Sequence, residues 1–283
     1  MSAKPHRSIA GQLVTLPLPG KKDRHLDGFW THGKGPRARR KLLIFVHGMG
    51  SNFYKSKFKK AWMQLGPSHG VDVFCFNNRG CEDQVADEKF SDCLHDIDAA
   101  MNFARHEGYQ EIYLLGHSTG CQKITYYQHK RKPSDVAALI LTAIGDDLAI
   151  ARRDLGKEYP RWLKRARELV ADGKGDTRLP TKCLGFTARR FLSAVDPRSI
   201  EANLFRLDGE LRTFRRLTLP ILAVFPEEEQ YACIPVREAG QKLAAVTSST
   251  SFSEVYIPRA DHSFHGEEEI CVRACLRWMR ALS

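Results

Sequence analysis

The sequence contains no run of about 18 apolar residues, the minimum that a membrane-spanning helix needs. Residues 1–17 contain no continuous apolar core of the kind that a secretory signal peptide carries. The chain also has no low-complexity tract, no repeat with a period of about 20–50 residues and no Cys-x-x-Cys pair. These absences exclude a helical membrane protein and a solenoid. We expect a soluble protein of a reducing compartment, the cytoplasm.

The eight cysteines are scattered along the chain, which argues against a disulfide framework. Cys271 and Cys275 are four residues apart in an expected helix, so they lie on one face of it. A pair of metal ligands is one interpretation of this spacing. Small buried side chains are the more common role of free cysteines, and we expect that role here.

Positive charges exceed negative charges by 11 in the 283 residues, and the excess is uneven. Residues 1–41 hold ten Lys and Arg against two Asp, and residues 147–216 hold seventeen against ten Asp and Glu. Such regions attract acidic substrates, nucleic acids or anionic lipids, although a solvated charged surface is the simpler explanation. No basic run is interleaved with aromatic residues and no zinc-finger spacing occurs, so we expect no nucleic-acid partner.

Short apolar runs alternate with longer helix-like segments, as one large α/β domain or a core with an insertion requires. Nearly continuous apolar strands between helices predict a mostly parallel sheet covered on both faces. The first two strands, 11–18 and 25–33, are expected to be antiparallel, with connectors at 21–24 and 34–41. Further strands are expected at 41–48, 71–80, 109–118, 136–145, 220–226 and 252–258. Helices are expected at 56–70, 92–108, 119–132, 233–247 and 267–283.

One segment, residues 146–218, breaks this alternation. It contains three helix-like stretches, at 151–173, 187–195 and 199–217, and no strong strand. A loop of this length is seldom structureless in a compact domain, and open α/β sheets bind ligands at their carboxyl edge. We therefore expect an α/β core, residues 1–145 and 219–283, with residues 146–218 inserted as a helical cap over that edge.

The sequence Gly116-His117-Ser118-Thr119-Gly120 matches the pattern Gly-x-Ser-x-Gly between an expected strand and an expected helix. This is the setting of a nucleophile elbow, where small neighbours permit the tight turn that raises a serine hydroxyl above the strand end. The helix N terminus directs backbone N–H groups to the same place. Ser118 is therefore the predicted nucleophile. The alternative is a serine that only caps the helix.

A serine hydroxyl needs a base to remove its proton, and the base is expected after the last strand. His262 lies there, directly before the terminal helix. His265 is the alternative, three residues closer to that helix. The place of His262 in the chain order favours it as the general base.

A carboxylate must orient this histidine and stabilise its charged form. The turn after the strand at 220–226 contains three glutamates and no aspartate. The acid commonly lies three residues after a glycine at the strand end, and counting from Pro226 in that place indicates Glu229. The alternatives that stay open are Glu228, Glu227, Asp146 and Asp147.

The last requirement is an oxyanion hole. Met49 follows the strand that ends before His47, and its N–H can pair with the N–H of Thr119, the residue after Ser118. Two donors that point at a developing oxyanion stabilise a transition state strongly in a dry site. His47 is expected to hold this loop rather than to take part in the reaction.

In this order, the pieces FVHGMGSN, FNNRG, LLGHSTG, FPEEEQ and PRADHSF resemble the α/β-hydrolase superfamily from about residue 41 to the C terminus. The segment GHSTGCQKITYY is also similar to a group of esterase-like hydrolases. The resemblance implies a serine hydrolase that forms an acyl-enzyme on Ser118, with His262 as the base and no metal or organic cofactor. The chain departs from the family at the acid, with proline where glycine is common and glutamate where aspartate is common.

The leading hypothesis is a carboxylic-ester hydrolase with a small or medium substrate. The arginine-rich residues 146–218 favour a substrate that carries a carboxylate or phosphate. Thioester, lactone, amide and carbon–carbon bond cleavage, and acyl transfer, use the same residues. A non-catalytic relative that binds a small molecule or a partner protein is an alternative of another class. So is a peripheral membrane or nucleic-acid binder that uses the basic N-terminal region. The sequence carries no signal for an oligomeric state.

Overall fold

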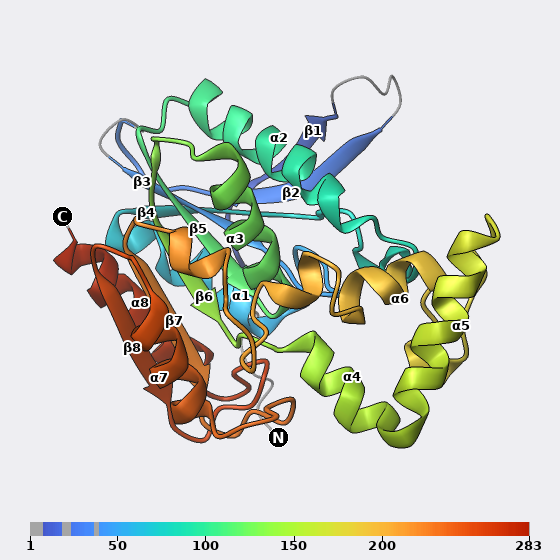
Figure 1. Ribbon diagram of the computed structural model, residues 1–283. Helices are drawn as coiled ribbons and strands as arrows, with labels where there is room; N and C mark the ends of the chain where they lie inside the picture. The colour runs from blue at the N-terminus through green and yellow to red at the C-terminus, as the bar shows by residue number, and fades with distance from the viewer. Residues whose placement is uncertain (1–7, 19–23, 37–39, 283) are drawn as a thin grey trace, which may run out of the picture.

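The computed structural model describes residues 8–18, 24–36 and 40–282 (Figure 1). Parts of the basic region 1–41 and of the connectors expected at 21–24 and 34–41 lie outside the described residues.

The described residues form one eight-stranded sheet with the order β1-β2-β4-β3-β5-β6-β7-β8. Its strands are β1 (Gln12–Pro17), β2 (His25–Thr31), β3 (Lys41–Val46), β4 (Val71–Phe76), β5 (Glu111–His117), β6 (Val136–Thr142), β7 (Ile221–Pro226) and β8 (Phe252–Ile257). β2 is antiparallel to both β1 and β4, and every other neighbouring pair is parallel. The prediction of a mostly parallel sheet that begins with two antiparallel strands is therefore confirmed.

Helices cover both faces of this sheet (Figure 1). One face packs against α1 (Lys57–Leu65) and α8 (Glu268–Ala281). The opposite face packs against α2 (Cys93–His106), α3 (Thr119–Arg131) and α7 (Val236–Val246). The expected helices of the core are thus confirmed in place and type, with ends that differ by a few residues.

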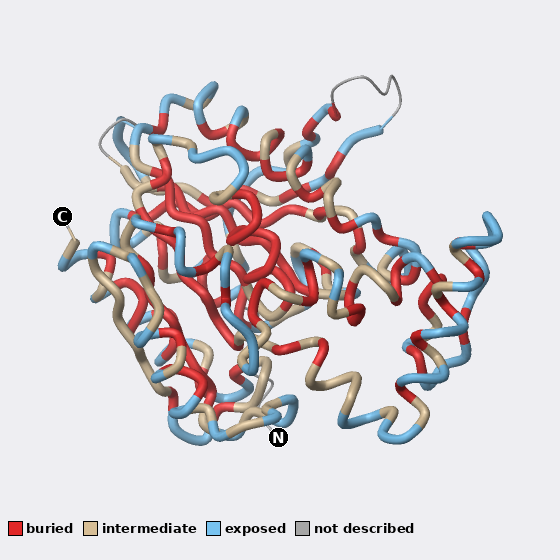
Figure 2. Tube along the Cα trace, in the orientation of Figure 1, coloured by how far each residue is buried: buried red, intermediate tan, exposed pale blue. Residues whose placement is uncertain are grey.

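β3 illustrates how the sequence produces the two layers. Leu42, Ile44 and Val46 belong to the apolar cluster on one face of the sheet. Leu43 and Phe45 belong to the cluster on the other face. Side chains alternate between the two faces of a strand, so a strand covered on both sides needs an unbroken apolar run. Figure 2 shows the resulting buried centre of the molecule.

Between β6 and β7 the chain forms α4 (Asp147–Leu155), α5 (Tyr159–Ala171) and α6 (Ala188–Val195), which share an apolar cluster of their own (Figure 1). The single helix expected at 151–173 is wrong, because α4 and α5 are separate. Gly156 takes a φ of +49°, which ends α4, and Pro160 occupies the first turn of α5, where its missing N–H costs nothing.

The helix expected at 199–217 is also wrong, since only two short 3₁₀ turns form there, Glu201–Asn203 and Phe214–Arg216. The backbone of this stretch uses tertiary partners instead of helical ones. The Leu207 N–H donates to Asp146 Oδ2 at 2.8 Å, and Leu211 has a φ of +50° that no helix accepts.

All eight cysteines are free thiols, and six of them are buried. Cys271 and Cys275 are buried in the face of α8 that packs on the sheet. No cluster of His, Cys, Asp and Glu suited to a metal ion occurs within residues 8–18, 24–36 and 40–282. In the same ranges, no helix combines the length and the apolar character needed to cross a membrane.

Candidate active site

Ser118 lies in the sharp turn between β5 and α3. Its backbone has φ 56° and ψ −129°, a conformation that a residue with a side chain adopts only under strain. The Ser118 N–H donates to the Thr142 carbonyl of the neighbouring strand at 3.0 Å, which holds the turn in this shape. Such strain is typical of functional positions, and here it is the geometry of a nucleophile elbow.

Three glycines make room for this turn. A Cβ on Gly120 would lie 2.1 Å from the Val46 carbonyl oxygen, and one on Gly116 would lie 2.5 Å from the backbone of Gly120. A Cβ on Gly48 would lie 2.8 Å from Ser118 Cβ and 3.3 Å from Ser118 Oγ. The loop after β3 therefore approaches the serine closely, because its residue at this point has no side chain.

His262 and Glu229 are joined by a hydrogen bond of 2.8 Å between His262 Nδ1 and Glu229 Oε2. Their side chains are only 14% and 5% exposed. The other carboxylate oxygen of Glu229 accepts the Tyr231 N–H at 3.1 Å, and the His262 N–H donates to Gln230 Oε1 at 3.0 Å. Both partners are thus fixed by the turn after β7, which leaves the Nε2 edge of the imidazole for other contacts.

The other carboxylates considered for this role have different partners. The Glu227 carboxylate pairs with Arg237, and Glu228 is exposed. Asp146 caps α4, since Oδ1 accepts the Ala149 N–H at 2.9 Å and Oδ2 accepts the Leu207 N–H. Asp147 accepts a hydrogen bond from Gln122 Nε2 at 3.1 Å.

The other two histidines singled out in the sequence also have separate environments. His265 is 61% exposed and pairs with Asp261 at 2.7 Å, so it lies on the surface. His47 is buried, and its Nδ1 contacts the Gly48 carbonyl at 2.8 Å. Burial, with the positive charge of Lys123 nearby, holds the pKa of His47 well below its usual value. This neutral imidazole belongs to the loop after β3.

Met49 and Thr119, the two residues expected to form the oxyanion hole, have backbone N–H groups without an acceptor in their own elements. In the loop after β3, the N–H groups of Gly50 and Ser51 donate to carbonyls, whereas that of Met49 has no acceptor among the described residues. Thr119 is the first residue of α3, where backbone N–H groups have no acceptor inside the helix. Both residues line the cavity that Ser118 faces.

This cavity has a volume of about 450 Å³ and is lined by Ser118 and His262 together. No hydrogen bond joins Ser118 Oγ to the His262 ring, as is common for such pairs before a substrate binds. Most of the remaining wall is apolar and comes from residues between β6 and β7, namely Ile150, Ala151, Leu155, Leu184, Phe186, Phe191, Ala194 and Val195. The size suits a small or medium organic molecule.

Two residues beside His262 were not anticipated from the sequence. His117 packs against the His262 ring, with centroids 5.2 Å apart, and Tyr231 meets it edge to face at 4.8 Å. Burial lowers the pKa of His117 well below its usual value, and the positive form of His262 lowers it further. His117 lies inside the Gly-x-Ser-x-Gly pattern, which predicts that it adjoins Ser118 but does not predict its contact with the His262 ring. Tyr231 has no such signal.

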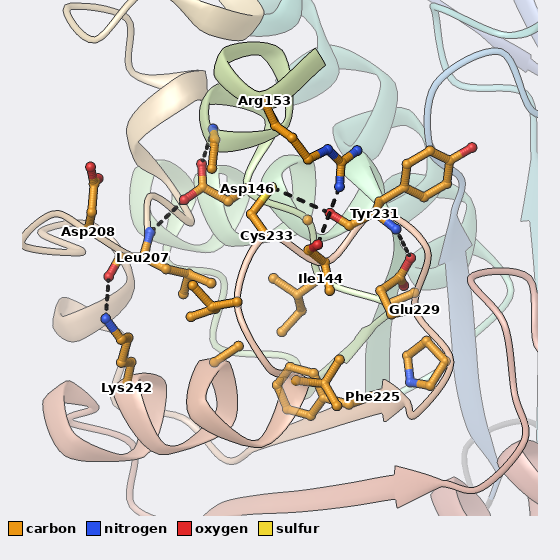
Figure 3. Close-up of a pocket in the computed structure, with 18 of the residues that line it drawn as sticks. Ile144, Asp146, Arg153, Leu207, Asp208, Phe225, Glu229, Tyr231, Cys233 and Lys242 are labelled. Carbon is orange, nitrogen blue, oxygen red and sulfur yellow. Dashed lines mark hydrogen bonds between the residues drawn. The ribbon is translucent and has the colours of Figure 1, made fainter. Parts of the chain in front are cut away.

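A second cavity of about 350 Å³ lies behind Glu229 and Tyr231 (Figure 3). Its floor includes Ile144 and Phe225, and Tyr231 lines both cavities. Three basic side chains and two aspartates surround it, namely Arg152, Arg153, Lys242, Asp146 and Asp208.

The arginines that favoured an anionic substrate do not line the cavity beside Ser118. Most of those with described contacts pair with carboxylates, such as Arg152 with Asp208 and Arg167 with Asp196. Among the described residues, the wall of the cavity beside Ser118 contains Lys182 as a cation and no arginine, and Lys182 pairs with Glu158. The arginine content therefore gives no support for an anionic substrate at this cavity.

Comparison with known proteins places these features in context. The family model described as the alpha/beta hydrolase family matches residues 43–274. No curated protein sequence matches the chain.

The fold is similar to those of several solved structures. One is the siderophore hydrolase EstB from Aspergillus fumigatus, with 18% identity, a TM-score of 0.75 and coverage of 99% of both chains. Another is Est1E from Butyrivibrio proteoclasticus, with 17% identity, a TM-score of 0.70 and coverage of 96% of this chain and 99% of that one. A thermostable carboxyl esterase from Bacillus coagulans gives 12% identity, a TM-score of 0.70 and coverage of 97% and 99%. At these identities the similarity concerns the fold.

Proposed function

Because the chain belongs to the alpha/beta hydrolase family, we propose that it is a serine hydrolase that cleaves a carboxylic ester or a related acyl bond. The observation that carries this proposal is one constellation of residues. Ser118 occupies a strained elbow and faces the same cavity as His262, whose Nδ1 is bonded to Glu229. The names of the carboxyl esterase and the siderophore hydrolase with similar folds agree with this activity.

In the proposed reaction, Ser118 Oγ attacks the carbonyl carbon while His262 Nε2 accepts its proton. Glu229 holds the Nδ1–H tautomer and stabilises the imidazolium that forms. The N–H groups of Met49 and Thr119 donate to the oxyanion of the tetrahedral intermediate. His262 then protonates the leaving group, and a water that it activates hydrolyses the acyl-enzyme.

Residues 146–218 are proposed to act as a cap over this site, and residues 1–145 and 219–283 as the core. Two observations support the division. α4, α5 and α6 share an apolar cluster separate from the two that cover the sheet. The same segment supplies most of the apolar wall around Ser118, so it excludes water and determines which substrates fit.

A burst experiment with 4-nitrophenyl esters of increasing acyl length tests the proposal. The wild type should release a burst of 4-nitrophenol equal to the enzyme concentration, followed by slower turnover, because 4-nitrophenolate leaves readily and deacylation is then the slower step. Ser118→Ala should lose at least about 10⁴-fold in kcat/KM.

Ser263→Ala is the matched control, because Ser263 adjoins His262 and its hydroxyl has no hydrogen-bond partner among the described residues. It should behave as the wild type. A folded wild type without burst or turnover would contradict the proposal and favour a binding protein. Equal turnover by Ser118→Ala would refute the role of Ser118.

A further inference from the structure

Asp147 is an acidic residue in the cavity beside Ser118 that the proposed reaction does not use. Ser118 follows β5, Asp147 follows β6, Glu229 follows β7 and His262 follows β8. These four strands are neighbours in the sheet, and Asp147 begins α4 after the strand that lies between those of the serine and of the glutamate. Its side chain is partly exposed, and the surface it exposes lines the cavity.

The described contacts of Asp147 leave its carboxyl group short of partners. Oδ2 accepts a hydrogen bond from Gln122 Nε2 at 3.1 Å, and this same amide also donates to the Gly145 carbonyl at 3.1 Å. No Lys or Arg among the described residues forms an ion pair with Asp147. Arg190, whose positive charge acts on Asp147, is held by Glu201 at 2.7 Å.

This environment disfavours a negative charge. Burial, with the carboxylates of Glu201 and Asp146 nearby, raises the pKa of Asp147 to about 8, against the opposing effect of Arg190. Asp147 is therefore mainly a neutral carboxylic acid at pH 7, with an O–H to donate. The other Asp, Lys and His side chains that line this cavity are already paired: Asp154 with Arg153, Lys182 with Glu158 and His262 with Glu229.

We propose that Asp147 is a specificity-determining residue, whose carboxyl group donates a hydrogen bond to an uncharged oxygen of the substrate outside the bond that is cleaved. The occupant is an ester with an ether, carbonyl or hydroxyl oxygen in one of its chains. A purely hydrocarbon chain in the same place would cover the carboxyl group and leave it unsatisfied, which costs binding energy.

The inference rests on the proposed hydrolase function, so its test compares pairs of esters that differ only by CH₂ and O. The acyl pair is 4-nitrophenyl pentanoate and 4-nitrophenyl 3-methoxypropanoate. The alcohol pair is butyl butanoate and 2-methoxyethyl butanoate, and their hydrolysis is measured by pH-stat titration of the acid released. For each pair, the ratio of kcat/KM (ether ester over alkyl ester) is compared between variants, which cancels the intrinsic reactivity of the two esters.

Asp147→Leu should lower this ratio by about tenfold in at least one pair. The ether ester then loses its hydrogen bond to Asp147, and the alkyl ester no longer leaves the Asp147 carboxyl group unsatisfied. In the wild type the ratio should fall as the pH rises through about 8, because a carboxylate cannot donate to an ether. Asp147→Asn keeps an N–H donor and cannot ionise, so it should keep the ratio and lose its pH dependence. Asp176→Leu, an exposed aspartate of the segment 146–218 that does not line this cavity, is the control and should leave the ratio unchanged.

An unchanged ratio for Asp147→Leu in both pairs would overturn the inference while leaving the hydrolase proposal intact. If Asp147→Leu fails to fold, Asp147→Asn decides, since a pH dependence equal to that of the wild type would also overturn it. A folded wild type that hydrolyses none of the four esters and reacts with no fluorophosphonate would refute both proposals.

Discussion

Replacing Glu229 with glutamine removes one negative charge next to His262 and leaves the shape of the side chain nearly unchanged. The proposed transition state places a positive charge on His262, 2.8 Å from Glu229 Oε2 at the nearest atoms. Both side chains are mostly buried, so an effective dielectric constant of about 20 and charge centres about 4 Å apart give a stabilisation of about 4 kcal/mol. At about 1.4 kcal/mol for each factor of ten, kcat/KM should fall about 10³-fold.

The assay is hydrolysis of 4-nitrophenyl butanoate, with thermal unfolding to verify that each variant is folded. Glu228→Gln makes the same chemical change one residue away on an exposed side chain, so it should retain activity within about twofold. The reasoning would be refuted if Glu229→Gln lost less than about tenfold, or if Glu228→Gln lost as much as Glu229→Gln.

Three further predictions concern stability. Gly120→Ala places a Cβ 2.1 Å from the Val46 carbonyl oxygen, so it should destabilise the fold by about 3 kcal/mol or more in a thermal melt, and a smaller change would contradict the close approach. Glu88→Gln removes the carboxylate that pairs with two buried cations, Lys123 and Arg190, so it should lower the free energy of unfolding in urea by about 3–5 kcal/mol. An unchanged unfolding midpoint would mean that the two cations do not need this carboxylate. Asp147 has a pKa raised to about 8 in the folded state, so the contribution of its carboxyl group to the stability of the wild type is lost as the pH rises from about 4 to about 8. Asp147→Asn should lack this loss, and parallel stability curves for both proteins over that range would contradict it.

The sheet and the elbow could be predicted because their signals are local. A strand covered on both faces is a mostly apolar run, and β3, β5, β6 and β7 contain such runs, whereas Asp72 interrupts the one in β4. The elbow needs small residues where the backbone comes close to its neighbours, and Gly116 and Gly120 stand at those positions. The order of strands and helices follows from the same alternation, and the family resemblance rests on the motifs from FVHGMGSN to PRADHSF that stand in this order.

Between β6 and β7 the same reasoning failed, because tertiary contacts decide the structure there. Helix-like composition at 199–217 does not form a helix, since the Leu207 N–H is taken by Asp146, a residue 61 positions earlier. The arginines looked like a ligand site in the sequence, but most of the described ones have carboxylate partners that no spacing revealed.

In the candidate site too, some residues could be predicted from local spacing and others depend on tertiary contacts. Counting along the turn indicated Glu229, which is bonded to His262, although its catalytic role stays a prediction. The contacts of Tyr231 and His117 with the His262 ring depend on how β5, β7 and β8 meet at one edge, and no local pattern signals them. The position of Asp147 in the cavity has the same origin.

The most direct test of the central claim is the mass of the protein after reaction with a fluorophosphonate, followed by peptide mapping of the adduct. The account predicts one phosphonyl group per chain, on Ser118, and none on Ser118→Ala. It also predicts greatly slowed labelling of His262→Ala, because the serine then has no base. A folded wild type that stays unmodified, or carries its adduct on another residue, would contradict the claim that Ser118 is the nucleophile.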